Sequence, residues 1–293
     1  MKVHFAGLEQ IESACILNKI SGINYSLFTV FPFICRQFKI GSGKSNGKQV
    51  TSYLTKNYKH TIMDSGLFTL MFGAHAGKRD RQFVEAWQKA IIKFVKDTGY
   101  TGTVVEVDCQ KILGVDSAWE FRKQLRLALP NNQQMNVFHI EDGKEGLREM
   151  AKWSKYIALS IPEFRALKWK NIPLKVNQLC NIIKNENPDI KIHLLGCTQK
   201  NILEKTKFCY SSDSTSWMQV NRWGEQLVYT DGDYSKIKRD IVVKNSKQLQ
   251  GQVKYVFEKT GLKVPKNLEG YSNNAMSGIY LKQMYTKYAG SQE

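Results

Sequence analysis

The chain has 293 residues, and its 43 lysines and arginines exceed its 26 aspartates and glutamates, which gives a formal net charge of +17. Hydrophobic residues make up 42% of the sequence, enough for a large buried core, but no apolar run of about 18 residues occurs, so no membrane span is expected. The positive surplus favours association with a polyanion such as a nucleic acid.

The cysteines are scattered, with no CxxC or CxC pair among Cys15, Cys35, Cys109, Cys180, Cys197 and Cys209. This spacing argues against a disulfide scaffold and against a structural zinc site, so no metal and no cofactor are expected. The first ten residues, MKVHFAGLEQ, lack the apolar core of a signal peptide. We therefore expect a protein of the cytoplasm, with no membrane association.

Short β-rich runs alternate with amphipathic segments along the chain, which is the pattern of βα units around a parallel sheet. The expected strands lie at 4–7, 24–30, 61–66, 102–108, 136–141, 156–160, 191–196 and 208–213. Eight strands with intervening helices indicate a single (β/α)8 TIM-like barrel rather than an open doubly wound sheet. The first strand is not followed by the GxGxxG that a dinucleotide-binding sheet would carry.

The clearest helix is expected at 81–96, where apolar residues recur at three- and four-residue spacing. Further helices are expected at 116–129, 144–153, 174–185 and 199–205, with Asp116 and Thr198 as N-caps. Residues 35–60 resemble a long loop followed by a short helix. After Asp213 we expect a hairpin at 223–229, helices at 234–245 and 249–260, and a polar tail. The predicted division is a catalytic barrel over 1–232 and a C-terminal helical extension over 233–293, packed on the barrel.

Residues 14–62 contain no acidic side chain, whereas lysines and Arg36 are spread through them, with Tyr53 and Tyr58 between them. We expect Lys39, Lys44 and Lys48 to contact phosphates, together with Arg222; an ordinary solvated surface is the alternative. The GSGKS at 41–45 resembles a phosphate loop, but position 38 is Phe where that motif needs Gly, so nucleoside triphosphate binding is not expected.

Polar and acidic residues recur at the carboxyl ends of the expected strands, where barrel enzymes place their active sites. They are Asp64, Glu106, Asp108, His139, Glu141, Ser160, Gly196 and Asp213. A single one of them is as well explained as a helix cap or turn residue, but their consistent placement indicates a shared site. His139 beside Glu141 has no HxxxH or HxH partner, so a pocket or core histidine is favoured over a metal ligand.

Two carboxylates at one barrel mouth, Asp64 and Asp213, fit chemistry at the anomeric carbon of a sugar. One attacks C1′ while the other handles the proton of the leaving base. Asp108 offers acceptors for the N1–H and amino protons of a guanine-like base, and it would reject adenine, which lacks that donor pattern.

Several of these segments resemble the tRNA-guanine transglycosylase superfamily, and more closely its DNA-acting 7-deazaguanine branch, the DpdA-type enzymes of phages and bacteria. MDSGLFT at 63–69 is similar to the family's DSGGFQ, VFHIEDGKEGLREM at 137–150 to its FGIVQGG…LRE, and HLLGCTQKNIL at 193–203 to its LMGVGTPEDIL. SSDSTSW at 211–217 stands where the family has MFDCVxPTR, and VNRWGEQLVY at 220–229 resembles the RNARNG that follows. YIALSIPE at 156–163 stands in place of a Gly-Gly turn.

The resemblance implies Asp213 as nucleophile, Asp64 as acid/base partner and Asp108 as the base-recognition residue. Glu141 stands where the family has a base-reading glutamine, and Ser160, Gly196 and His139 would line the same base pocket. The tRNA enzymes carry a CxCxxC…H zinc site after the nucleophile strand, and this sequence has no such cysteines. A strongly basic member without zinc is more similar to the DNA branch.

The implied function is exchange of guanine in DNA for a 7-deazaguanine, such as the 7-cyano form, through a covalent Asp-nucleotide intermediate. In a phage this would protect the DNA from restriction, with the enzyme in the host cytoplasm. The implied partners are DNA and the free 7-deazaguanine base; a DNA-opening helper and the oligomeric state stay open. The alternatives are the same chemistry on tRNA, a barrel glycoside hydrolase, and a basic, non-catalytic DNA-binding protein on a degenerate barrel.

Overall fold

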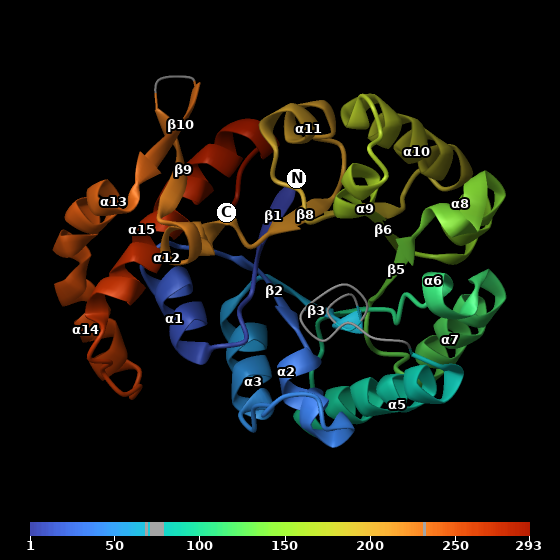
Figure 1. The fold of residues 1–293 in the computed structure, drawn as a ribbon, viewed down its shortest axis with the longest axis horizontal. Coiled ribbons are helices and arrows are strands. Elements are labelled where there is room, and N and C mark those ends of the chain that lie inside the picture. The colour runs from blue at the N-terminus through green and yellow to red at the C-terminus, as the bar shows by residue number, and fades with distance from the viewer. Residues whose placement is uncertain (68–69, 71–78, 231–232) are drawn as a thin grey trace.

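Eight parallel strands close into a barrel at the centre of the computed structural model, which describes residues 1–67, 70, 79–230 and 233–293 (Figure 1). The strands are β1 (Lys2–Ala6), β2 (Tyr25–Thr29), β3 (His60–Asp64), β4 (Thr103–Val105), β5 (Gln134–Phe138), β6 (Tyr156–Ser160), β7 (Lys191–Leu195) and β8 (Ser211–Ser214). Each strand pairs in parallel with the next, and β8 returns to β1 in the register that sets His4 opposite Asp213. The predicted (β/α)8 barrel is confirmed.

Several strand bounds differ from the prediction by one or more residues, and three of these differences have a clear local reason. β4 covers only Thr103–Val105, so Asp108 reaches the barrel mouth from the loop that follows it. β5 ends before His139 because the His139 N–H donates to the Asp142 carboxylate at 2.9 Å and starts a 3-10 turn. β8 begins three residues later than expected, since the N–H of Cys209 turns back to the carbonyl of Thr206.

Helices surround the barrel (Figure 1). They are α1 (Ile11–Lys19), α2 (Phe31–Ile34), α3 (Gly47–Asn57), α5 (Arg81–Thr98), α6 (Gln110–Leu113), α7 (Val115–Ala128), α8 (Gly143–Trp153), α9 (Ile161–Ala166), α10 (Ile172–Glu186), α11 (Lys200–Lys205) and α12 (Gln219–Trp223). The predicted apolar face of α5 is buried through Val84, Trp87 and Ile91, and Asp80 caps the helix by accepting the Phe83 N–H at 2.8 Å. No helix of the described residues is both long and apolar enough to cross a bilayer.

Both predicted N-caps, Asp116 and Thr198, are wrong. α7 begins one residue earlier, after Gly114 at φ 82°, so Asp116 lies in its first turn, where its charge favours the helix dipole. α11 begins at Lys200 after Gln199. Between β2 and β3 the chain forms α2 and a 3-10 turn at Cys35–Phe38, then a loop, then α3, so the expected loop and helix are confirmed in outline.

Beyond α12, the described chain forms an antiparallel hairpin and three α-helices on one side of the barrel (Figure 1). They are β9 (Glu225–Thr230), β10 (Asp233–Lys238), α13 (Arg239–Ser246), α14 (Gln250–Lys259) and α15 (Leu268–Ala289). The predicted helix at 234–245 therefore starts only at Arg239, because the residues before it pair with β9. The predicted polar tail is wrong: α15 is a 22-residue helix whose buried side includes Ser272, Asn273 and Ser277, a polar pattern that hid it.

The helical extension packs on α1 through an apolar cluster that joins Ile16 to Val242, Phe257, Ala275 and Met276. After α15, the side chain of Gln292 accepts the N–H of Val3 at 2.8 Å and donates to the carbonyl of Met1 at 3.0 Å. The last residues thus lie against the amino end of β1.

Polar side chains fill the amino-terminal half of the barrel interior. His4 and His60 share a hydrogen bond of 2.7 Å, and His60 bonds Thr103 Oγ1 at 2.9 Å. Burial lowers the pKa of His60 to about 4 and that of His4 well below its usual value, so both rings are neutral at physiological pH. Hydrogen-bonded side chains therefore fill this end of the barrel, which we call its polar floor, and His4 and His60 carry no charge there.

Glu106 does not lie at the barrel mouth as the sequence predicted. Side chains alternate along a strand, and Val105 points into the barrel cluster, so Glu106 points outward toward α7. There it is 1% exposed and bonds the Arg122 guanidinium at 2.9 Å and 3.0 Å, Asn136 at 2.5 Å and the N–H of Val137 at 3.0 Å. Glu106 is a structural residue that ties β4, β5 and α7 together.

Removing one member of this buried pair should be costly. Arg122→Met leaves the Glu106 carboxylate buried without its counter-charge, and we expect the free energy of unfolding to fall by about 3 kcal/mol. Urea denaturation measures the loss. Lys93→Ala, which breaks the exposed Lys93–Asp97 pair at 2.7 Å, is the matched control and should change stability by about 1 kcal/mol or less. Equal effects of the two changes would contradict the structural role of Glu106.

Candidate active site at the carboxyl end of the barrel

The carboxyl ends of the strands bring together most of the predicted site residues. Asp64 ends β3, Ser160 ends β6 and is 9% exposed, and Asp213 lies in β8. Asp108 and His139 follow β4 and β5 in the loops. The barrel topology thus converts separate strand ends into one cluster, as the sequence predicted. Phe68 and Thr69 of the MDSGLFT motif lie outside the described residues.

Asp213 is held by two N–H donors that reach the same oxygen. His193 Nε2 lies 3.1 Å and the Gly196 N–H 2.8 Å from its Oδ1. Its Oδ2 has no hydrogen-bond partner among the described residues, and the residue is 7% exposed. Gly196 has φ +57°, and a Cβ at this position would lie 2.8 Å from Pro162 Cγ, so a glycine is needed there. The carboxylate is oriented through one oxygen while the other stays available.

His193 is a site residue that the sequence prediction missed. It is fully buried, and its Nδ1 lies 2.6 Å from Ser211 Oγ, which in turn is bonded by the Tyr156 hydroxyl. In this arrangement Nδ1 can accept from Ser211 while Nε2 donates to Asp213. The signal in the sequence was a histidine within the otherwise apolar run IHLL, at a position that alternation directs into the barrel.

Asp64 lies in a different environment from Asp213. Its Oδ2 accepts the Gly66 N–H at 3.0 Å. Burial raises the pKa of Asp64 to about 7, and the negative charges of Asp108 and Asp213 add to that rise. Asp64 is therefore divided between its acid and its carboxylate form at neutral pH, which is the condition for a group that gives and takes a proton.

A chain of charged side chains starts at Asp108 and runs along the part of the rim that follows β4, β5 and β6. His139 Nε2 lies 3.0 Å from Asp108 Oδ2, and His139 Nδ1 lies 3.1 Å from Glu163 Oε2. Lys111 Nζ pairs with Glu163 Oε1 at 2.6 Å. Burial opposes the charged form of His139, but its hydrogen bonds to Asp108 and Glu163 outweigh that effect and raise its pKa to about 10. A protonated His139 thus fixes the Asp108 carboxylate.

Glu163 and Lys111 were not predicted as site residues. His139 connects them to Asp108 across the ends of different strands, so no local pattern in the sequence shows the connection. Glu163 lies in the first turn of α9, directly after β6, and Lys111 lies in α6. The signal for Glu163 was an acidic residue three positions after Ser160, within the motif YIALSIPE.

Glu141 is exposed on the 3-10 turn Ile140–Asp142. One atom each from His139, Glu141 and Glu163 lie within 4.8 Å of one another, a group that could hold a metal ion. Both ring nitrogens of a protonated His139 carry protons for its two carboxylate partners, so the ring has no lone pair for a metal. Metal binding here would require His139 to lose its proton and leave that chain.

The loop after β1 adds an acid that the sequence prediction missed. Glu9 Oε1 accepts the N–H of Thr29, at the end of β2, at 2.8 Å, and burial raises the pKa of Glu9. Lys44 Nζ donates to the carbonyl of Glu9 at 3.1 Å, so this predicted phosphate contact also ties two loops together. The other predicted phosphate contacts, Lys39, Lys48 and Arg222, are exposed.

No family model matches the sequence, and no curated protein matches it either. Among the solved structures, QR15, an aldolase, superposes with a TM-score of 0.47 at 12% identity over 73% of this chain and 89% of its own. The N-acetylneuraminate lyase of Proteus mirabilis gives a TM-score of 0.45 at 8% identity over 95% of this chain and 98% of the lyase. An intracellular xylanase from Thermoanaerobacterium saccharolyticum gives 0.40 at 11% identity over 72% and 84% of the two chains. These likenesses say nothing of activity, and the barrel itself is established by the strand pairing.

The raised pKa of Asp64 makes stability depend on pH in a defined direction. Between the ordinary aspartate pKa of 3.8 and the folded value of about 7, the folded state binds more protons than the unfolded state, so this group lowers stability as pH rises. Asp64→Asn removes that dependence. We expect the variant to gain about 2–3 kcal/mol relative to the parent on going from pH 5 to pH 8.

Urea denaturation of both proteins at the two pH values measures this gain. Asp116→Asn, a change at an exposed aspartate, is the control and should show no such gain. A constant difference between the Asp64 variant and the parent at both pH values would mean that Asp64 titrates normally.

Proposed function

We propose that this chain is a DNA-guanine transglycosylase, which exchanges guanine in DNA for a 7-deazaguanine such as the 7-cyano form. The observation that carries the proposal is the contrast between two carboxyls at one barrel mouth. Asp213 is oriented through Oδ1 and keeps Oδ2 free, whereas Asp64 has a pKa of about 7. This division supplies a nucleophile and an acid/base group for displacement at an anomeric carbon.

In the first step, Asp213 Oδ2 attacks C1′ of the target deoxyguanosine and forms a C1′–O bond. The bond from C1′ to N9 breaks, its electron pair stays with the guanine, and protonated Asp64 gives the leaving base its proton. In the second step, the 7-deazaguanine replaces guanine, Asp64 takes the proton from its N9, and that nitrogen attacks C1′. The bond to Asp213 breaks, and both carboxyls return to their starting forms.

The Asp108 chain supports recognition of the base. Protonated His139 holds Oδ2 of Asp108. The other oxygen, Oδ1, has only a long hydrogen bond of 3.5 Å from Ser65 Oγ, so it can accept a proton of the base instead. A guanine or 7-deazaguanine offers N1–H and amino protons to such an acceptor, and adenine does not. Glu141 and Ser160 are proposed to line the same pocket, while the Gly196 N–H is already occupied by Asp213.

The target base must leave the stack before C1′ can reach Asp213 at the barrel mouth. The net charge of +17 and the exposed cations Lys39, Lys48 and Arg222 support binding of the DNA backbone around that nucleotide. In a phage, replacing guanine at such sites would hide them from restriction nucleases. An additional protein that opens the duplex fits the same scheme.

Incorporation of labelled guanine and of labelled 7-cyano-7-deazaguanine into DNA and into tRNA, measured side by side, tests the proposal. We expect label in DNA and no label with Asp213→Asn. We also expect a covalent adduct on Asp213, which a denaturing gel detects. Asp116→Asn should retain full activity. Label in tRNA alone would mean that tRNA rather than DNA is the substrate. Label in neither, with salt-sensitive DNA binding intact, would favour a non-catalytic binding protein.

His193 should act as a positioning residue for Asp213. His193→Phe removes one of the two donors to Oδ1, so we expect kcat to fall about 10- to 100-fold with little change in the KM for the free base. Steady-state exchange kinetics measure this. His193→Gln, which restores a side-chain N–H donor, should recover part of the loss; equal losses for both variants would indicate a merely structural role.

A further inference from the structure

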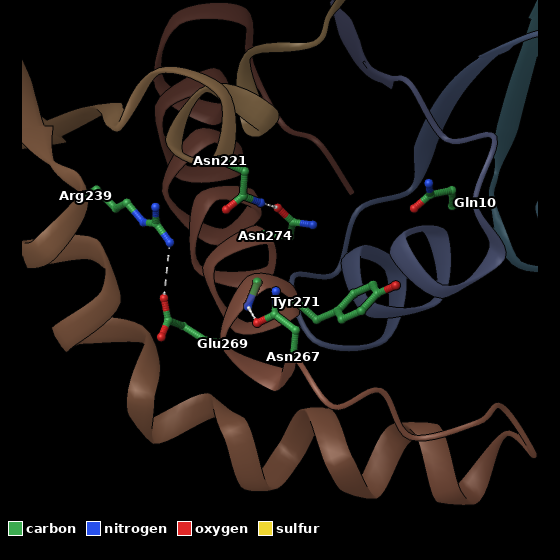
Figure 2. Close-up of a pocket in the computed structure, with 8 residues that line it drawn as sticks. Gln10, Asn221, Arg239, Asn267, Glu269, Tyr271 and Asn274 are labelled. Carbon is green, nitrogen blue, oxygen red and sulfur yellow. Dashed lines mark hydrogen bonds and ion pairs between the residues drawn. The ribbon is translucent and has the colours of Figure 1, made fainter.

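A polar cleft of about 400 Å³ lies beside the barrel mouth, between the loop after β1 and the C-terminal helices (Figure 2). Gln10 and Tyr271 form one side of it, and Arg239 and Glu269 form the other. Its size suits one nucleoside, and half of its eight lining residues are amides. None of its residues belongs to the carboxylate cluster described above.

Two asparagines in this cleft present a matched donor and acceptor. Asn221 Nδ2 donates to Asn274 Oδ1 at 2.6 Å, which leaves the Oδ1 of Asn221 and the Nδ2 of Asn274 without a hydrogen-bond partner among the described residues (Figure 2). Asn274 is only 9% exposed, so its free N–H groups are offered to the cleft rather than to bulk water. A neighbouring acceptor and donor match the edge of a nucleobase.

Two other depressions share lining residues with the cleft. Gln10 and Tyr271 also line a hollow of about 480 Å³ that is bordered by Lys44 and Ser45. Arg239 also lines a hollow of about 450 Å³ that is bordered by Lys244 and Lys247. We call these three hollows together the furrow. It has amides at its centre and lysines at both ends, and an unpaired strand presents a base between two phosphates in the same order.

The charges along the furrow are mixed. Arg239 pairs with Glu269 at 3.5 Å, but both side chains are about half exposed, so this pair is weak and a phosphate can compete for the guanidinium. At the Lys44 end, Glu9 and Glu12 also border the hollow and oppose an anion. The other end holds one acid, Asp240, against Lys244 and Lys247, so it is the stronger phosphate contact.

The furrow lies close in the fold to the proposed nucleophile. Asn221 is in α12, which follows β8 and its Asp213 after a single 3-10 turn. Gln10 follows β1, the strand that pairs with β8. A nucleotide chain whose target sugar reaches Asp213 would pass over this part of the rim.

We infer that the Asn221–Asn274 cleft holds the base of a nucleotide that neighbours the target guanine in single-stranded DNA, and that it gives the protein a preference for that neighbouring base. The inference rests on the proposed function for its account of the target, but the cleft binds the strand whether or not exchange follows. Phosphates on either side of the bound base contact Arg239 and Lys247.

The test uses the full chain with Asp213→Asn, which binds without turnover, and a labelled single-stranded DNA library with random bases around one guanine. Adding Asn221→Ala or Asn274→Ala should weaken binding about three- to tenfold, the loss of one neutral hydrogen bond, and flatten the preference at one neighbouring position. Lys247→Ala should instead leave that preference intact and lower the salt dependence of binding by about one ion.

Asn181→Ala, at an exposed asparagine of α10, is the matched control and should bind like the parent. Thermal melting separates lost binding from lost folding, and the exposed Asn221 variant serves if the Asn274 variant unfolds. Unchanged affinity and preference in the Asn221 and Asn274 variants would overturn the inference, as would a parent that does not bind single-stranded DNA. If these variants lose the preference while the chain that keeps Asp213 catalyses no exchange in the incorporation assay, the cleft is upheld and the proposed activity is rejected.

Discussion

The pairing of β8 with β1 is the constraint on which the candidate site depends. It sets Asp213 opposite His4 and closes the sheet, so the last strand brings its carboxylate to the same mouth as Asp64 on β3. The alternation of side chains then determines what each inward position meets. Along β8, Ser211 faces the polar floor and Asp213 faces the mouth, and His193 on β7 spans the space between these two residues.

The chemistry follows from two unlike surroundings for two like groups. Asp213 meets N–H donors that leave one oxygen free, whereas Asp64 is half-buried close to other carboxylates and resists ionisation. The rim at Asp108 is different again, because His139, Glu163 and Lys111 continue its charge in an alternating chain. Environment rather than residue type therefore separates the proposed nucleophile, proton carrier and base-reading group.

The sequence predicted what depends on local pattern. Alternating short apolar runs with acids at their ends gave the barrel, and the colinear motifs placed Asp64, Asp108 and Asp213 at one mouth. What it missed depends on contacts between distant segments. The outward direction of Glu106 follows from the phase of a three-residue strand, and its partner Arg122 comes from the next helix but one. α15 was missed because the first half of its buried side carries Ser272, Asn273 and Ser277, and its pattern is decided by α1, α13 and α14 rather than by its own periodicity.

The polar floor of the barrel also bears on how the molecule responds to temperature. Barrels of this class are commonly filled by branched aliphatic residues, whose exposure on unfolding raises the heat capacity. Here His4, His60, His193 and Tyr156 occupy much of that volume, and exposing their polar atoms lowers the heat capacity instead. The change in heat capacity on unfolding is thereby reduced, and the curve of stability against temperature is flatter than an aliphatic interior of equal size would give. The free energy of unfolding then varies less with temperature.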